Sequence, residues 1–201
     1  ITKILNTNYF NHTKLILIQN VIQLGIYHNK RSCLENSPTE WVLVSDSDNF
    51  FPISYFEKIK DIYINNNYKL NHTHFYGSSN PQYKDMIENK IENRMYDFGS
   101  IIINHYNWNY IVYIKNHWNL ALNDGNWLLH KSVLKYLPLN INDKDVLATD
   151  AIYISRLLVL NGYQYSMYSD LQYIHFVHYS SSWRNKQKEN LDIWTSTDYR
   201  I

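Results

Sequence analysis

The sequence of 201 residues lacks features that define several specialised classes of protein. It has a single cysteine, Cys33, so no disulfide can form within the chain and no oxidising compartment is required. No apolar run approaches the roughly 20 residues that span a bilayer, and no charged-then-apolar leader opens the chain. We therefore expect a soluble protein without a membrane span, located in the reducing cytoplasm.

The chain also lacks an excess of charge of either sign. Its formal net charge is +1, and its lysines and arginines are scattered along the sequence. A protein that binds duplex nucleic acid normally carries a concentrated basic surface. Nucleic acid is therefore not the expected partner.

Glycine and proline are scarce, with 5 and 4 residues, and no Pro/Gly/Ser-rich linker, internal repeat or block of like charge divides the chain. The length suits one domain with a shared hydrophobic core. We expect residues 1–201 to form a single domain.

Hydrophobic patterning predicts alternating strands and helices. Short apolar runs predict strands, and apolar residues at helical spacing predict helices. The predicted strands are 14–20, 40–45, 100–104, 164–168 and 173–179, and the predicted helices are 27–36, 53–64, 81–99, 131–137 and 144–163. Strands separated by helices indicate an α/β fold whose sheet is mostly parallel and flanked by helices on both faces.

Two acids, Asp46 and Asp48, interrupt the apolar stretch WVLVSDSDNFF at residues 41–51. Open α/β sheets bind ligands beyond the carboxyl ends of their strands, and these acids directly follow a predicted strand. Residues i and i+2 of an extended segment point to the same side, so both carboxylates can face one cation. Carboxylate oxygens suit Mg²⁺ or Mn²⁺, with the phosphates of a substrate completing the coordination shell.

The same acidic pair fits other interpretations. Acids at a strand end also serve as helix-capping or solvated turn residues. An EF-hand loop requires an oxygen ligand and then a glycine where this chain has Phe50 and Phe51, which excludes that motif. A phosphatase with a nucleophilic aspartate usually has Thr or Val where Phe50 stands, so this alternative is weakened but stays open.

Four stretches, taken in order, resemble the GT-A fold glycosyltransferases of the family 2 type. They are NVIQLGIYHNKRSCLENSPTEWVLVSDSDNFFPISYF (20–56), GNWLLHKSVLKYLP (125–138), ATDAIYISRLLVLNGYQY (148–165) and YIHFVHYSSSW (173–183). The resemblance implies a single GT-A, Rossmann-like domain. Its nucleotide-binding part would cover about 1–50, its acceptor part about 51–183, and a C-terminal lid 184–201. The strand and acidic turn that open the family's fold are not clear before Asn20.

The resemblance also implies a function. The protein would be a metal-dependent hexosyltransferase that moves a sugar, with inversion, from a nucleotide diphosphate donor to an acceptor hydroxyl on a glycan or protein. UDP is the donor nucleotide expected from its frequency in the family. The alternatives are a nucleotide-sugar binding module and a phosphohydrolase that uses the same acids.

The resemblance assigns roles to individual residues. Asp48 would bind the Mn²⁺ or Mg²⁺ ion directly, Asp46 would reach the ribose or a metal-bound water, and His178 would complete the metal shell. His175 and His178 are three apart on a predicted strand, so they are expected to face opposite sides and not to bind one ion together. Asp150 would be the general base, with Asp124 in reserve. Further nucleotide contacts are implied for Asn20, Lys30, Arg31, Ser47, Trp127 and Arg184.

Each of these residues also has a purely structural interpretation. An aspartate at the start of a helix is favoured by the helix macrodipole, which would account for Asp150 without catalysis. A single histidine on a strand, such as His178, is often a hydrogen-bonded core residue. The segment around Arg184 could be a solvated tail.

Overall fold

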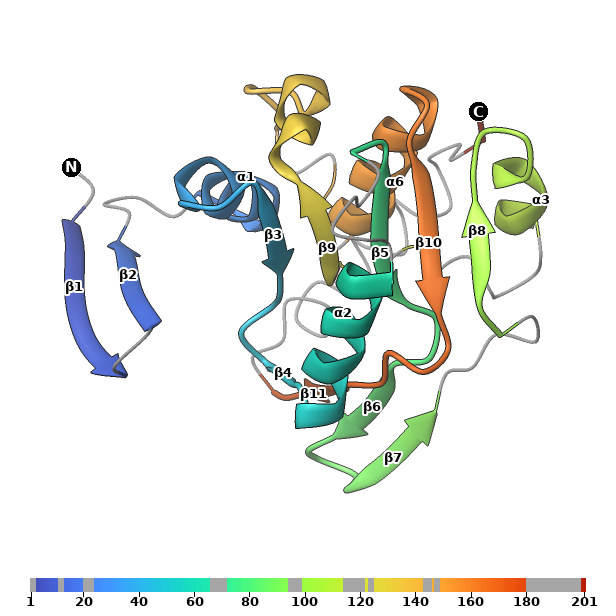
Figure 1. Cartoon of the computed structure of the whole chain (residues 1–201). Helices are drawn as coiled ribbons and strands as arrows, with labels where there is room; N and C mark the ends of the chain where they lie inside the picture. The colour runs from blue at the N-terminus through green and yellow to red at the C-terminus, as the bar shows by residue number, and fades with distance from the viewer. Residues whose placement is uncertain are drawn as a thin grey trace.

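The computed structural model describes residues 3–10, 13–19, 24–65, 72–93, 99–113, 122, 125–142, 146, 149–179 and 200–201. Strands β1 (Lys3–Phe10) and β2 (Thr13–Gln19) form an antiparallel hairpin that, within these residues, pairs with no other strand. Figure 1 shows this hairpin beside the other two sheets. The strand predicted at 14–20 is confirmed as a strand, but it does not belong to the main sheet.

The main sheet has five strands. Their order is β3 (Trp41–Val44), β9 (Trp127–His130), β5 (His74–Ser78), β10 (Gln164–Tyr168) and β8 (Ile101–Ile103). A second sheet of four short strands lies below it in Figure 1. Its order is β4 (Asn49–Phe50), β11 (Ile174–Val177), β6 (Gln82–Asp85) and β7 (Lys90–Asn93).

The predicted strand direction is wrong, and with it the expected Rossmann-like GT-A sheet. Of the eight strand pairings in the described part of the chain, only β5–β10 and β6–β11 are parallel. The sheets are therefore mixed and mainly antiparallel. The cause lies in the pattern used for the prediction: a short apolar run indicates burial on both faces, and this burial is the same for either strand direction.

The helix predicted over 81–99 is also wrong, because residues 82–93 form the β6–β7 hairpin; residues 94–98 lie outside the described residues. The Oδ1 atom of Asp85 accepts hydrogen bonds from the backbone N–H groups of Ile87 and Glu88, at 2.8 and 3.2 Å. Asn89 then takes a positive φ of 51°. Asp and Asn are turn-forming residues for these reasons, and this local chemistry overrides the helical spacing of the apolar residues.

Helices surround the main sheet. They are α1 (Ile26–Asn36), α2 (Ile53–Asn65), α3 (Trp108–Tyr113), the 3₁₀ helix η1 (Lys131–Tyr136) and α6 (Asp150–Leu160). Within the helix predicted at 144–163, α6 covers Asp150–Leu160 and ends before Gly162, whose φ is 83°. Val146 is also helical, and residues 144, 145, 147 and 148 lie outside the described part of the chain. Among the described residues, no helix has the length and apolar character needed to cross a bilayer.

Alternating side chains divide the core between the two faces of the main sheet. Phe75, Trp127 and Leu129 pack in one hydrophobic cluster with residues of α1, η1 and α6. Tyr76 and Leu128, the intervening residues, pack in the other cluster with α2. Because successive side chains of a strand point to opposite faces, this alternation fixes α1 and α6 on one face and α2 on the other.

Ile152→Val is expected to lower the free energy of unfolding by about 0.5–1.5 kcal/mol. Ile152 lies on the inner side of α6 and is fully buried, so the lost methylene leaves a small cavity. Urea unfolding measures the change. The same substitution at Ile53, which is largely exposed on α2, is the matched control and should have a smaller effect. Equal losses at both sites would contradict the packing described above.

Candidate functional site

The acidic pair lies in a turn that directly follows β3. The backbone N–H of Asn49 donates to the carbonyl oxygen of Asp46 at 3.3 Å, which closes the chain over residues 46–49. Ser47, between the two acids, is exposed. The segment is therefore not extended, and the two carboxylates have different neighbours: that of Asp46 contacts a lysine, and that of Asp48 lies near two histidines.

The lysine is Lys30, which α1 directs into the core. Tyr27, Lys30 and Leu34 are the buried residues of this helix and share one face of it. Tyr27 and Leu34 pack in the main cluster, so the Lys30 side chain between them points inward, and only 7% of the residue is exposed. The ammonium group therefore requires acidic partners in the interior.

Lys30 joins two carboxylates that are far apart in the sequence. Its Nζ atom lies 3.3 Å from Oδ1 of Asp46 and 2.9 Å from Oδ2 of Asp150, the first residue of α6. Burial alone would lower the pKa of Lys30, but the carboxylates of Asp150 and Asp46 outweigh it and raise this pKa above its ordinary range. Burial raises the pKa of Asp150, against the opposing effect of the Lys30 ammonium. Lys30 is therefore a permanent cation within the site.

Two neighbours of the ion pairs come from the start of β9. Gly125 has a φ of 68°, which favours glycine, and a Cβ atom there would lie 2.5 Å from Lys30 Nζ, so any other residue would displace the ammonium from this position. The indole ring of Trp127 lies on another side, with its centroid 5.5 Å from Nζ. Trp127 is itself almost completely buried, so it supports Lys30 from within the core.

Asp48 faces His175 on β11 and His178, the predicted metal ligand, which directly follows β11. Its Oδ1 atom lies 3.9 Å from Nδ1 of His175, and its Oδ2 atom lies 3.7 Å from Nε2 of His178. The sequence pattern placed these histidines on opposite sides of one strand. Because β11 ends at Val177, strand alternation does not extend to His178, and both imidazoles lie on the side of Asp48.

A buried amide, which the sequence analysis missed, connects these groups. Oδ1 of Asn126 accepts hydrogen bonds from the Asp46 backbone N–H at 3.2 Å and from Nδ2 of Asn49 at 2.7 Å. Its Nδ2 atom donates to the Tyr173 hydroxyl at 2.8 Å. Oδ1 of Asn49 lies 2.7 Å from Nδ1 of His175, so the histidine donates through Nδ1 in this arrangement. The sequence feature that could have indicated this residue is a polar side chain, Asn126, directly before the short apolar run WLL of residues 127–129.

The donor groups fit a partly open cation site. Asp48 offers a carboxylate beside the imidazole of His178, and Mn²⁺ accepts both kinds of ligand. The Nδ1 atom of His175 also faces Asp48, but it donates to Asn49 and so does not bind an ion from this side. Within the described ranges, no three His, Cys, Asp or Glu side chains are grouped so that they could hold an ion by themselves. A cation at Asp48 would therefore need further oxygen ligands, which a diphosphate and water can supply.

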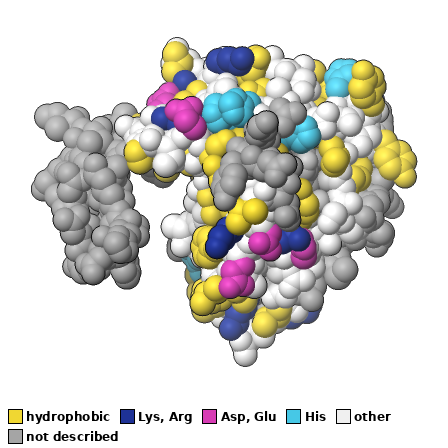
Figure 2. All heavy atoms as spheres, viewed as in Figure 1, with side chains coloured by type: hydrophobic (Ala, Val, Ile, Leu, Met, Phe, Trp, Pro, Cys, Tyr) yellow, Lys and Arg dark blue, Asp and Glu magenta, His cyan; other side chains and the backbone are white. Residues whose placement is uncertain are grey.

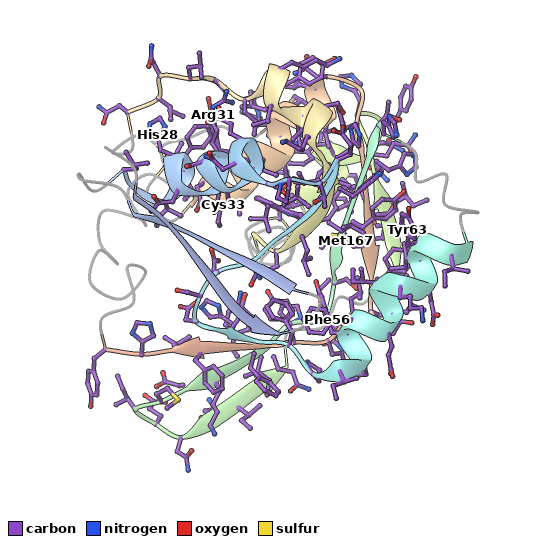
Figure 3. All side chains as sticks on the ribbon, turned by 60° about the vertical axis from the view of Figure 1, so that its left-hand side comes forward. His28, Arg31, Cys33, Phe56, Tyr63 and Met167 are labelled. Carbon is purple, nitrogen blue, oxygen red and sulfur yellow. The ribbon has the colours of Figure 1, made fainter. Side chains whose placement is uncertain are left out.

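Among the remaining predicted site residues, the structure describes Arg31, which forms its hydrogen bonds away from this centre. Arg31, which follows Lys30 on α1 (Figure 3), donates from Nη1 to the carbonyl oxygens of Leu134 and Leu137, at 3.1 and 2.6 Å. It therefore ties α1 to η1 in this structure. Asn20, Asp124, Arg184 and all but the last two residues of the lid predicted over 184–201 lie outside the described residues.

The described surface around these elements carries charges of both signs. On the face shown in Figure 2, acidic, basic and hydrophobic side chains are interspersed. The feature that sets the site apart from this mixed surface is its pair of buried charged residues, Lys30 and Asp150. Buried, paired charges beside partly exposed acids are a common feature of functional sites.

The chain matches no protein-family model, and no curated protein sequence is significantly similar to it.

Proposed function

We propose that the protein is a metal-dependent glycosyltransferase that moves a sugar from a nucleotide diphosphate donor to an acceptor hydroxyl. One observation carries the proposal: the turn after β3 brings Asp46 and Asp48 together with Lys30, Asp150, His175 and His178, which come from α1, α6, β11 and the residue that follows β11. A nucleotide diphosphate departs readily only when its developing negative charge is neutralised. Grouped carboxylates, imidazoles and a buried ammonium support a site of that kind.

Asp48, with a histidine, would hold the Mn²⁺ or Mg²⁺ ion. When bound, such an ion supplies Lewis-acid stabilisation of the departing diphosphate. Asp46 contacts Lys30, with its Oδ1 atom 3.3 Å from the ammonium, and precedes Asp48 by two residues in the same turn. Its proposed role is to orient the donor through the ribose or through a metal-bound water.

Asp150 is the proposed general base for the acceptor hydroxyl. Burial raises its pKa, and a carboxylate whose pKa is raised toward neutrality is a better proton acceptor than an exposed one. Lys30 occupies its Oδ2 atom in this structure, so the acceptor must approach the remainder of the carboxylate. The hydroxyl proton would pass to Asp150 as the oxygen forms its bond to the sugar carbon and the diphosphate leaves with the bonding electrons.

One observation favours a second candidate, a phosphohydrolase with a nucleophilic aspartate. Such an enzyme needs a lysine beside its nucleophile, and Lys30 lies beside Asp46. The Asp46 carboxylate would attack phosphorus and form an acyl phosphate, and Asp48 would relay a proton from solvent water to the oxygen of the departing alcohol. Water would then release phosphate and restore the carboxylate. The histidines near Asp48 have no part in that reaction, so the transferase is preferred.

Thermal unfolding with defined ligands separates the two functions. If the protein is a transferase, Mn²⁺ and UDP together should raise its melting temperature by about 5–10 °C at concentrations near 100 times Kd. Mn²⁺ alone and UDP alone are the controls and should give smaller shifts. A nucleotide-release assay with a panel of UDP- and GDP-sugars then identifies the donor.

Beryllium fluoride with Mg²⁺ tests the alternative, because it forms an acyl-phosphate mimic on a nucleophilic aspartate. A shift with beryllium fluoride that Asp46→Asn abolishes, without a shift from Mn²⁺ and UDP, would replace the transferase by the hydrolase. A shift with Mn²⁺ and UDP but no release of nucleotide from any donor sugar would indicate a binding module.

A further inference from the structure

Asn126 directly precedes β9 in a run of six consecutive buried residues, 125–130, and is one of the two polar side chains in that run, with His130. None of its surface is exposed, and its amide makes the three hydrogen bonds described above. Burying an amide without hydrogen bonds is unfavourable, so its position is determined by these partners. Two of the three come from the acidic turn, namely the Asp46 backbone and the Asn49 side chain.

The acidic turn is held from two sides. On one side, the N–H of Phe176 in β11 donates to the carbonyl oxygen of Asp48 at 3.1 Å, and β11 pairs with β4 so that His175 lies opposite Asn49. On the other side, Oδ1 of Asn126 receives both donors from the turn. The Asn49 side chain spans the two, because its Nδ2 reaches Asn126 and its Oδ1 reaches His175.

We infer that Asn126 is a positioning residue, which fixes the turn carrying Asp46 and Asp48 and orients His175 through Asn49. It does not touch the cation or the donor itself. It determines the separation of the Asp48 carboxylate from the histidines, and so the affinity for a divalent cation with a nucleotide diphosphate. The part that concerns affinity rests on the proposed function, and the part that concerns the turn does not.

The chemistry explains why an asparagine occupies this position. The turn offers only donors here, an N–H and an NH₂, while Tyr173 receives a hydrogen bond from the opposite end of the amide. A side-chain amide has an acceptor and a donor at that separation. Alanine would remove all three hydrogen bonds, whereas aspartate would keep the acceptor for the turn and could accept from the Tyr173 hydroxyl.

Two measurements on Asn126→Ala test the inference. Hydrogen–deuterium exchange should become at least tenfold faster over residues 45–49, because the Asp46 N–H loses its acceptor. Calorimetric titration of Mn²⁺ in the presence of UDP should show affinity lowered by about 10–100-fold, as is usual when a group supporting a metal ligand is removed. Asn126→Asp should restore most of the exchange protection.

Asn80→Ala is the matched control. Asn80 is also a buried asparagine, but its amide hydrogen bonds to the carbonyl oxygen of Ser169, beyond the end of β10. This variant should leave both readouts within about twofold of the wild type. Equal effects from Asn80→Ala would mean that general loss of stability, rather than positioning, moves the turn, and would overturn the inference.

The remaining outcomes separate the inference from the proposed function. If Asn126→Ala leaves exchange over 45–49 unchanged, Asn126 does not fix the turn and the inference is wrong, whatever the protein binds. If exchange accelerates but Mn²⁺ affinity is unchanged, the claim about affinity is wrong. If the wild type binds no Mn²⁺ with UDP, the proposed function is wrong and the part concerning affinity is overturned with it, while accelerated exchange still supports the fixing of the turn.

Discussion

Asp48→Ala is expected to lower the rate of sugar transfer by about 10²–10³-fold, the usual cost of removing one group that stabilises a developing charge. Among the described residues, Asp48 lies within 4 Å of both His175 and His178, so its removal takes away the carboxylate that faces the two histidines. The shift in melting temperature caused by Mn²⁺ with UDP should disappear as well. Nucleotide release and thermal unfolding, measured on the same preparation, check both expectations.

Asp170→Ala is the control for this change. Asp170 follows β10 as Asp48 follows β3, but it pairs with Lys58 at a more exposed position. Its removal should leave transfer and the response to Mn²⁺ with UDP intact. Full activity in Asp48→Ala would exclude this aspartate as the metal ligand. A folded Asp48→Ala protein that still binds Mn²⁺ with UDP would place the ion elsewhere.

The sequence predicted the positions of most elements because their signals are local. The runs that became β3, β10 and β11 are short and apolar, and the helical spacing after Pro52 became α2. Strand direction could not be obtained in this way, because it depends on which distant strands pair. The β6–β7 hairpin was missed for a different reason: the turn chemistry of Asp85 and Asn89 outweighs the apolar spacing around it.

The site was also predictable only in part, because its residues come together through contacts between distant parts of the sequence. Asp46 and Asp48 stood out as acids that follow a predicted strand, and Asp150 was assigned by the family resemblance; the structure brings Asp46 and Asp150 onto one ammonium. Lys30 was expected near the nucleotide, whereas its spacing from Tyr27 and Leu34 places it on the inner face of α1. Asn126 acts on a turn 77–80 residues away, and no local pattern reports such a contact.

The buried charges lead to the largest expected effect on stability. Lys30→Met should lower the free energy of unfolding by about 3–5 kcal/mol, the usual cost of removing one partner of a buried ion pair. Methionine keeps most of the volume of the lysine stem, so the loss comes mainly from the Asp150 carboxylate, which is only 4% exposed and would have no cation beside it. Asp46 contributes less, because about a third of its side chain is exposed to water. Urea unfolding at neutral pH measures the change.

A second variant and a control distinguish this electrostatic cause from poor packing. In Lys30→Met/Asp150→Asn the buried negative charge is absent, so more than half of the lost stability should return, although the proposed base is absent too. Lys58→Met removes a lysine from the more exposed pair with Asp170 and should cost no more than about 1 kcal/mol. If the double variant were as unstable as Lys30→Met, the defect would lie in the fit of methionine beside Gly125 and Trp127. Lys30 would then stabilise the fold through the fit of its side chain in the core rather than through its charge between the two carboxylates.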